Sequence, residues 1–220
     1  MKNETVTLAD LAVTKPGATR VFLAHGLDFC CRGRRPLAEA CSEKGLDPEA
    51  VLGEIAAEER PAGDLTRWAT RPLPELLAFI ETYYHASLRT EIPALIAMAE
   101  KVEQVHAEKA TCPRGLAAHL RTMQGAVEEH LDKEEQVLFP LIRSGRGRGV
   151  SAPIHVMEDE HVDHSRALAR LREITANLTA PPEACTTWRA LYLRLRQLSD
   201  DLMEHIHLEN NILFPRALTE

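Results

Sequence analysis

Apolar residues recur at intervals of three and four positions along most of the chain, and alternating patterns typical of strands are almost absent. This periodicity predicts four long helices, near 73–107, 114–143, 152–178 and 182–217. The breaks between them (TCPRG, SGRGRGVSAP and TAPP) each hold a turn-forming residue and a proline. Four helices joined by short connections predict an all-α protein with an up-down-up-down four-helix bundle.

The first sixty residues predict a small helical N-terminal domain, residues 1–60, made of several short helices. Asp47 can cap one of them, because Pro48 is well suited to the first helical position. Residues 61–72 are rich in proline, glycine and threonine and are expected to form a linker. The bundle then occupies residues 73–220. The expected breaks between the short helices fall at KPGA, DFCCRGRRP and GLDP.

Two of the long helices carry a histidine and a glutamate four positions apart, His130 with Glu134 and His205 with Glu209. The surrounding sequences, EEHLDKEEQVLFP and MEHIHLENNILFP, share the same Leu-Phe-Pro ending. Residues four apart lie on one face of a helix, and the neighbours one and two turns away are nearly all apolar. A single such pair is ordinarily an exposed ion pair. Two copies on apolar faces favour a metal site, because a buried carboxylate needs a compensating cation.

The other two long helices each place a histidine on an apolar face, and these are His85 and His161. A lone histidine of this kind is usually a core residue, but the spacing indicates otherwise. His85 precedes His130 by 45 positions, and His161 precedes His205 by 44 positions. Each half of the bundle therefore supplies His, then His-x-x-x-Glu. We expect four imidazoles and two carboxylates to surround one central cavity with near two-fold symmetry.

The predicted donor set selects among metals. Imidazoles and carboxylates without a thiolate suit iron, zinc or manganese. If both glutamates bridge two ions, each ion receives about four protein donors, which nearly saturates tetrahedral zinc and leaves positions open on iron. We therefore expect two iron ions in a carboxylate- or oxo-bridged, non-haem di-iron centre.

The composition and charge of the chain bear on which partners it binds and on the cellular compartment in which it is expected. A formal charge of −7 makes a nucleic acid or an anionic membrane an unexpected partner. The N-terminus lacks the apolar core of a signal peptide, and no apolar run reaches the roughly 18 residues of a membrane span. Five cysteines form no repeating framework, so reduced thiols and a cytoplasmic location are expected.

The order of the six predicted ligands resembles the hemerythrin-like family and, more closely, the RIC (repair of iron centres) family. GLDFCCRG (26–33) is similar to that family's small N-terminal domain, which carries adjacent cysteines. VMEDEH (156–161), PPEACTTW (181–188) and the two His-Glu segments resemble its bundle. The resemblance covers the whole chain.

The resemblance implies a di-iron protein that restores iron–sulfur clusters damaged by nitric oxide or oxidants. Its implied partners are damaged iron–sulfur proteins, nitric oxide or oxygen as a small ligand, and an electron donor. Nitric oxide reduction at the centre and a homodimer are left open. Two other functions are also left open: a non-catalytic module that binds or senses oxygen or nitric oxide, and a purely structural bundle.

Cys30 and Cys31 are expected to form an exposed, reactive pair outside the di-iron centre. Adjacent cysteines cannot easily form a disulfide with each other, because the ring strains the intervening peptide. Three arginines follow, and Pro36 is a suitable first residue for the next helix. Positive charge and a helix N-terminus lower a thiol pKa, so transient iron binding or thiol exchange is the expected role.

Several other side chains have simpler expected roles. We expect His207 and Glu160 to be solvated. His164 lies one turn from His161, and a role as a substitute ligand or as a group behind the ligands is left open for it. His106 is expected to be structural or exposed, and Cys185 to be an ordinary core or surface thiol.

Overall fold

The computed structural model describes residues 6–15, 17–58, 65–145 and 149–220. Within these residues the chain is helical, and its only strand-like pairing is an isolated bridge between Thr7 and Pro36, so the predicted all-α class is confirmed. The chain divides into two compact units. Leu77–Leu202 is called the bundle unit here, and Met1–Leu76 together with Met203–Glu220 is called the terminal unit.

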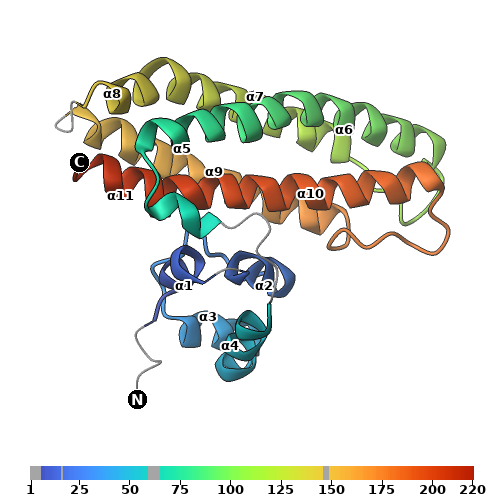
Figure 1. Cartoon of the computed structure of the whole chain (residues 1–220). Helices are drawn as coiled ribbons and strands as arrows, with labels where there is room; N and C mark the ends of the chain where they lie inside the picture. The colour runs from blue at the N-terminus through green and yellow to red at the C-terminus, as the bar shows by residue number, and fades with distance from the viewer. Residues whose placement is uncertain (1–5, 16, 59–64, 146–148) are drawn as a thin grey trace. The chain divides into compact units, whose positions relative to one another are not determined.

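The bundle unit consists of long helices that pack side by side (Figure 1). Helix α6 packs against α7, and α7 packs against α9. The first part of α10 returns to α6, where Arg194 and Glu91 form an ion pair of 2.7 Å. The elements are α5 (Leu73–Phe79), η2 (Ile80–His85), α6 (Ala86–Val105), α7 (Leu116–Lys133), η3 (Glu134–Leu138), α8 (Phe139–Arg143), α9 (Ser151–Ile174) and α10 (Thr186–Leu208).

The third long helix is shorter than the sequence predicts, because α9 ends at Ile174 and not near residue 178. Three consecutive residues, Ala176, Asn177 and Leu178, adopt positive φ angles of 48°, 57° and 57°. Residues with side chains rarely adopt this left-handed conformation, and a helix cannot continue through it. The Thr175 hydroxyl accepts a hydrogen bond from the Leu178 N–H at 3.1 Å and stabilises the turn.

The terminal unit holds the short N-terminal helices and the end of the chain. Its apolar core includes Leu8, Phe22, Phe29 and Val51, and Met203 packs against it. The elements are α1 (Leu8–Thr14), α2 (Ala18–His25), α3 (Leu37–Lys44), α4 (Pro48–Ala57), the 3₁₀ turn η1 (Leu65–Ala69), η5 (Glu209–Leu213) and α11 (Phe214–Ala217), together with the last residues of α10.

The helix starts in this unit agree closely with the sequence signals. The Asp47 side chain accepts a hydrogen bond from the Glu49 N–H, so the predicted cap of α4 is confirmed. Pro36 is the residue before α3 and not its first residue, a difference of one position. Of the expected linker, residues 61–64 lie outside the described residues, and Leu65–Ala69 form η1 with Leu65 and Trp68 buried.

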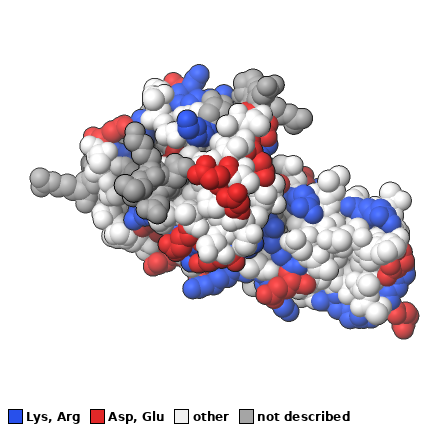
Figure 2. All heavy atoms as spheres, turned by 90° about the horizontal axis from the view of Figure 1, so that it is seen from below, with Lys and Arg blue, Asp and Glu red and all other residues white. Residues whose placement is uncertain are grey.

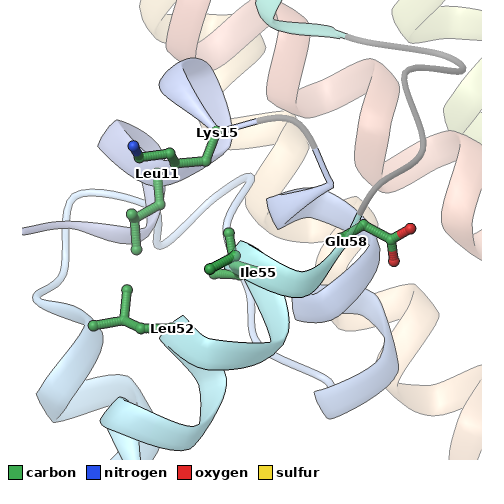
Figure 3. A pocket seen from close by; sticks show the side chains of 6 residues that line it. Leu11, Lys15, Leu52, Ile55 and Glu58 are labelled. Atoms are coloured by element: carbon green, nitrogen blue, oxygen red, sulfur yellow. The ribbon is translucent and has the colours of Figure 1, made fainter.

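A cavity of about 330 Å³ lies between α1 and α4 in the terminal unit (Figure 3). Its wall is mostly apolar, with Lys15 and Glu58 as its charged members. The apolar members are Leu11, Leu52, Ile55 and Ala56. An ion pair of 3.0 Å with Arg20 holds the Glu58 side chain.

The surface carries both signs of charge. Figure 2 shows Lys and Arg side chains intermixed with Asp and Glu over the described residues of one face, with no continuous basic patch there. None of the helices in the described ranges combines the length and the apolar character that crossing a membrane requires.

Candidate metal centre

Three of the predicted ligands lie where an α-helix widens into a π-helical turn. His85 is the last residue of η2, while Glu134 and Glu209 are the first residues of η3 and η5. In the last two turns, the carbonyl of the glutamate accepts a hydrogen bond from the N–H five residues later, at Phe139 and Phe214. Single π turns inside helices are frequent at functional sites, since they change the direction of the side chains that follow.

The repeated Leu-Phe-Pro sequence explains why both His-Glu helices change at the same place. Pro140 and Pro215 stand at the start of α8 and α11. A proline has no N–H to donate, so the regular hydrogen-bond ladder cannot pass through it. In each helix, the predicted ligand glutamate therefore lies six residues before the proline that interrupts the hydrogen-bond ladder.

The bundle unit gathers four of the predicted ligands in its interior. Glu134, His85 and His161 have no exposed surface, and His130 is 2% exposed. His130, Glu134 and His161 each offer one ligand atom, and these atoms lie within 4.8 Å of one another. The Nε2 atoms of His130 and His161 are 3.1 Å apart. The two rings therefore point the same nitrogen toward one position.

The Glu134 carboxylate lies between two histidines from different helices. Its Oε2 atom is 3.4 Å from Nε2 of His85 and 3.6 Å from Nε2 of His130. The carboxylate therefore reaches imidazoles from two helices at once.

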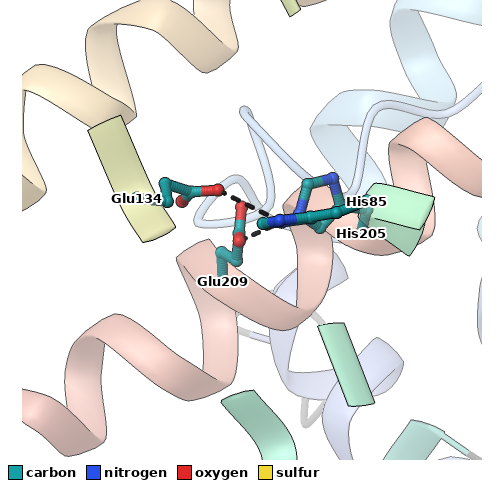
Figure 4. Close-up of side chains that lie close together, drawn as sticks. All are labelled: His85, Glu134, His205 and Glu209. Carbon is teal, nitrogen blue, oxygen red and sulfur yellow. Dashed lines mark hydrogen bonds and ion pairs between the residues drawn. The ribbon is translucent and has the colours of Figure 1, made fainter. Parts of the chain in front are cut away.

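The terminal unit contains the other His-Glu pair. Nε2 of His205 lies 2.9 Å from Oε1 of Glu209, and neither side chain has exposed surface. Figure 4 draws a pair from each unit, with dashed lines joining His85 to Glu134 and His205 to Glu209. The i,i+4 arrangement predicted from the sequence is therefore present and buried in both helices.

Comparison with known proteins agrees with this donor set. A model of the hemerythrin HHE cation binding domain matches residues 80–217, a range that contains all six predicted ligands. A second model, described as a domain of unknown function (DUF542, ScdA_N), matches residues 4–59. The chain is 47% identical, over 212 residues and 96% of both chains, to the iron-sulfur cluster repair protein YtfE of Yersinia pseudotuberculosis serotype IB (strain PB1/+).

The YtfE protein of Yersinia pestis (strain Pestoides F) is 47% identical over the same length, again with 96% of each chain covered. That of Y. pseudotuberculosis serotype O:1b (strain IP 31758) is 46% identical over 212 residues and 96% of both chains. The chain belongs to the YtfE family. The predicted hemerythrin-like bundle with a small helical N-terminal domain is confirmed, and so is the resemblance to repair proteins of this kind.

Two carboxylates outside the predicted ligand set orient the imidazoles. Oε2 of Glu160 accepts a hydrogen bond from Nδ1 of His130 at 2.8 Å, and Oε1 of Glu135 accepts one from Nδ1 of His85 at 2.8 Å. With the proton on Nδ1, Nε2 of each ring is left to bind a metal. The expectation that Glu160 is solvated is therefore wrong, since the side chain is partly buried and engaged with a predicted ligand.

These contacts also fix the charge of the two carboxylates. The hydrogen bond from His130 outweighs burial and, with Lys133 at 2.6 Å, lowers the pKa of Glu160 to about 2. Burial opposes ionisation of Glu135, but hydrogen bonds from Arg89 and His85 prevail and lower its pKa. Both groups are thus anionic at neutral pH. Sequence reasoning missed them because each depends on a partner in a different helix.

Two further histidines are buried beside the predicted ligands. His164 meets the His130 ring edge-on, with the ring centroids 4.9 Å apart. His207 has no exposed surface, so the expectation that it is solvated is wrong. The Asn211 side chain lies 2.9 Å from its Nδ1, Phe29 contacts its ring, and burial lowers its pKa to about 3. His207 is therefore a neutral core residue.

The adjacent cysteines differ from each other in exposure. Cys30 is 2% exposed and Cys31 is partly exposed, so the expected exposed pair is wrong for Cys30. The hydrogen bond from Cys30 to Cys31, followed by burial and the negative charge of Asp28, raises the pKa of Cys30 well above its usual range. The arginines that follow in the sequence do not overcome these effects.

The cysteine loop is attached to the helix of the second His-Glu pair. Asn210 and Asn211, which follow Glu209 directly, donate side-chain hydrogen bonds of 3.1 Å to the carbonyl groups of Cys30 and Phe29. Ligand atoms of Asp28, Cys30 and Cys31 lie within 4.8 Å of one another. The thiols therefore form a second small group of donors within the terminal unit.

Removing the carboxylate behind His130 should weaken metal binding. We predict that Glu160→Ala lowers iron affinity by about 10- to 100-fold, because His130 loses the acceptor that fixes its ring. A chelator competition, followed by the iron that stays on the protein, measures this. Asp159→Ala, at the exposed neighbouring position, is the matched control and should bind iron like the unchanged protein. Equal iron retention in both variants would show that Glu160 does not orient a ligand.

Alkylation should distinguish the two cysteines. In the reduced native protein we expect iodoacetamide to modify Cys31 before Cys30, because Cys30 is buried and its raised pKa disfavours the reactive thiolate. Mass spectrometry of peptides at successive times gives both rates. In urea the two rates should become similar, which serves as the control. A Cys30 rate that equals or exceeds that of Cys31 in the native protein contradicts the described loop.

Proposed function

We propose that the chain is a non-haem di-iron protein that repairs damaged iron–sulfur clusters. The observation that carries the proposal is the buried Glu134 carboxylate, which has imidazoles from two different helices within 3.4 and 3.6 Å. The relatives that cover nearly the whole chain are named iron-sulfur cluster repair proteins, and this supports the cellular role.

The proposed centre takes six ligands, His85, His130, Glu134, His161, His205 and Glu209. The hemerythrin match supports one centre, since it treats residues 80–217 as a single cation-binding domain. The repeated order of ligands in the two halves of the sequence supports two ions with a bridging glutamate from each half. Imidazole and carboxylate donors without a thiolate fit iron.

Each group around the proposed centre has a definite task. Bound iron would supply the redox chemistry and the positions for a small ligand. Glu135 and Glu160 keep His85 and His130 in the tautomer that presents Nε2 inward. Phe139 stacks on the His85 ring at a centroid distance of 5.6 Å and covers it with an apolar surface.

The adjacent cysteines are proposed to receive iron or exchange thiols during repair. Their attachment to Asn210 and Asn211 supports this role, because these residues follow the ligand Glu209 in the same π turn. The substrates would be damaged iron–sulfur proteins, with nitric oxide or oxygen as the small ligand and an electron donor as a further partner. The division into an N-terminal domain, a linker and a bundle, and a cytoplasmic location, belong to the same proposal.

Iron content tests the proposed ligand set. We expect about two irons per chain in the purified protein, and a loss of at least about one iron in Glu134→Ala and equally in Glu209→Ala. Each variant removes a donor from both ions if the glutamate bridges. Metal analysis per protein chain measures the result, with Glu129→Ala as the control because that side chain is exposed on the same helix as His130.

Two outcomes would contradict the centre as proposed. Full iron content in both glutamate variants would exclude bridging by these carboxylates. Iron loss on substitution in one half of the bundle only would exclude the symmetric arrangement. In either case circular dichroism should first show that the variant keeps its helices.

A reconstituted repair reaction tests the function. We expect the iron-loaded protein to restore activity to an iron–sulfur dehydratase that nitric oxide has inactivated, and Glu134→Ala to restore none. The double variant Cys30→Ser, Cys31→Ser should keep its iron but repair more slowly, because the proposed transfer group is lost. Recovery of dehydratase activity over time is the measurement. Iron binding and nitric oxide uptake without any recovery would instead identify a binding or sensing module.

A further inference from the structure

A cysteine and a histidine meet in the bundle unit outside the proposed metal centre. Cys185 lies just before α10 and is exposed, and its Sγ is 3.1 Å from Nε2 of His106, which follows α6. His106 is only 8% exposed and packs on the Trp188 ring at a centroid distance of 5.1 Å. The imidazole is therefore fixed from behind, and the sulfur in front of it faces solvent.

The backbone that presents Cys185 is held by side chains from two directions. Lys109 Nζ donates to the Glu183 carbonyl at 2.9 Å, and the Thr111 hydroxyl donates to the Glu183 carboxylate at 2.6 Å. Arg189 donates to the carbonyl of Ala184 at 3.0 Å and to that of Pro182 at 2.8 Å. A cysteine on an ordered loop keeps a constant position relative to its histidine.

The start of α10 adds a second favourable interaction. The Cys185 carbonyl accepts a hydrogen bond from the Arg189 N–H at 3.0 Å, so Cys185 occupies the cap position of a 23-residue helix. The N-terminus of a helix stabilises negative charge, so this position suits a transition state in which negative charge develops on the sulfur.

We propose that Cys185, with His106 as its proton acceptor, is a site of reversible mixed-disulfide formation with low-molecular-weight disulfides such as oxidised glutathione. The thiol proton passes to Nε2 of His106, and the Cys185 sulfur attacks one sulfur of the disulfide. A new S–S bond forms at Cys185, the S–S bond of the reagent breaks, and the departing thiolate takes the proton from His106. Cys185 is oxidised, half of the reagent is reduced, and a free thiol reverses the exchange.

Three of the other four cysteines lack the solvent exposure of Cys185. Cys30, Cys41 and Cys112 are buried. Burial is the main factor that raises the pKa of Cys41 and of Cys112. The proposed site does not depend on iron binding or on cluster repair, so it can be tested by itself in the full chain.

The test is the rate of modification at each cysteine of the reduced protein by oxidised glutathione, followed by peptide mass spectrometry. We expect Cys185 to react at least about tenfold faster than the same cysteine in a synthetic peptide of residues 181–188, where the histidine and the ordered loop are missing. His106→Gln should slow the reaction at Cys185 by about tenfold, because an amide cannot take the proton.

The controls show whether the reaction rate at Cys185 depends on its pairing with His106 or on general properties of the protein. His155→Gln changes an exposed histidine elsewhere on the bundle unit and should leave the rate unchanged. Cys185→Ser should remove the modified peptide altogether. A native rate equal to that of the peptide overturns the proposal, and so does a folded His106→Gln variant with the unaltered rate. If His106→Gln does not fold, the proposal is decided by comparing the reaction rate of Cys185 in the native protein with its rate in the peptide.

Discussion

Burial of the Glu134 carboxylate costs free energy that only positive charge or hydrogen bonds can offset. The side chain has no exposed surface, and it faces imidazoles from two helices. Each of those imidazoles donates a hydrogen bond from its Nδ1–H to another carboxylate. The Nε2 atom that faces Glu134 therefore carries a lone pair. Electron-pair donors gathered around one point favour a cation there. The helix ends, the π turns and the outer acids all serve this arrangement.

Charge alternates outward from the proposed centre. The imidazoles of His85 and His130 are followed by the anionic Glu135 and Glu160, and these in turn contact Arg89 and Lys133 nearer the surface. Each layer contacts the one before it, so the carboxylates that hold His85 and His130 are themselves paired with basic side chains. Because the pKa of Glu160 is lowered to about 2, its hold on His130 persists through the physiological pH range. The orientation of the ligand is therefore insensitive to pH near neutrality.

Periodicity correctly predicted that the ligand candidates are buried, because it reports which face of a helix is apolar. It could not predict what covers the opposite face. His207 lies two positions from His205 and was expected in solvent, yet Phe29 and Asn211 bury it within the terminal unit. Cys30 was misjudged for a related reason. The charged residues next to it in sequence indicated exposure, whereas its surroundings are set by Asn210 from the other end of the chain.

The same limit applies to Glu135 and Glu160, whose roles arise only when a histidine of another helix comes within 2.8 Å. It applies as well to the shortened end of α9, since no residue in Ala176–Leu178 is a glycine that would signal a left-handed turn. Local sequence predicted helices, caps and ligand spacing. Contacts between distant segments decided burial and the charge state of the groups behind the ligands.

The π turn Glu209–Leu213 joins the two kinds of donor in the terminal unit. It begins with a predicted metal ligand, and its next two residues hold the carbonyl groups of Cys30 and Phe29. A shift of the backbone at Glu209 must therefore move the side chains that fix the cysteine loop. Because the two asparagines directly follow the glutamate in the same turn, this coupling needs no large rearrangement. A protein that passes iron from imidazole and carboxylate ligands to thiols would require its two donor groups to be linked in this way.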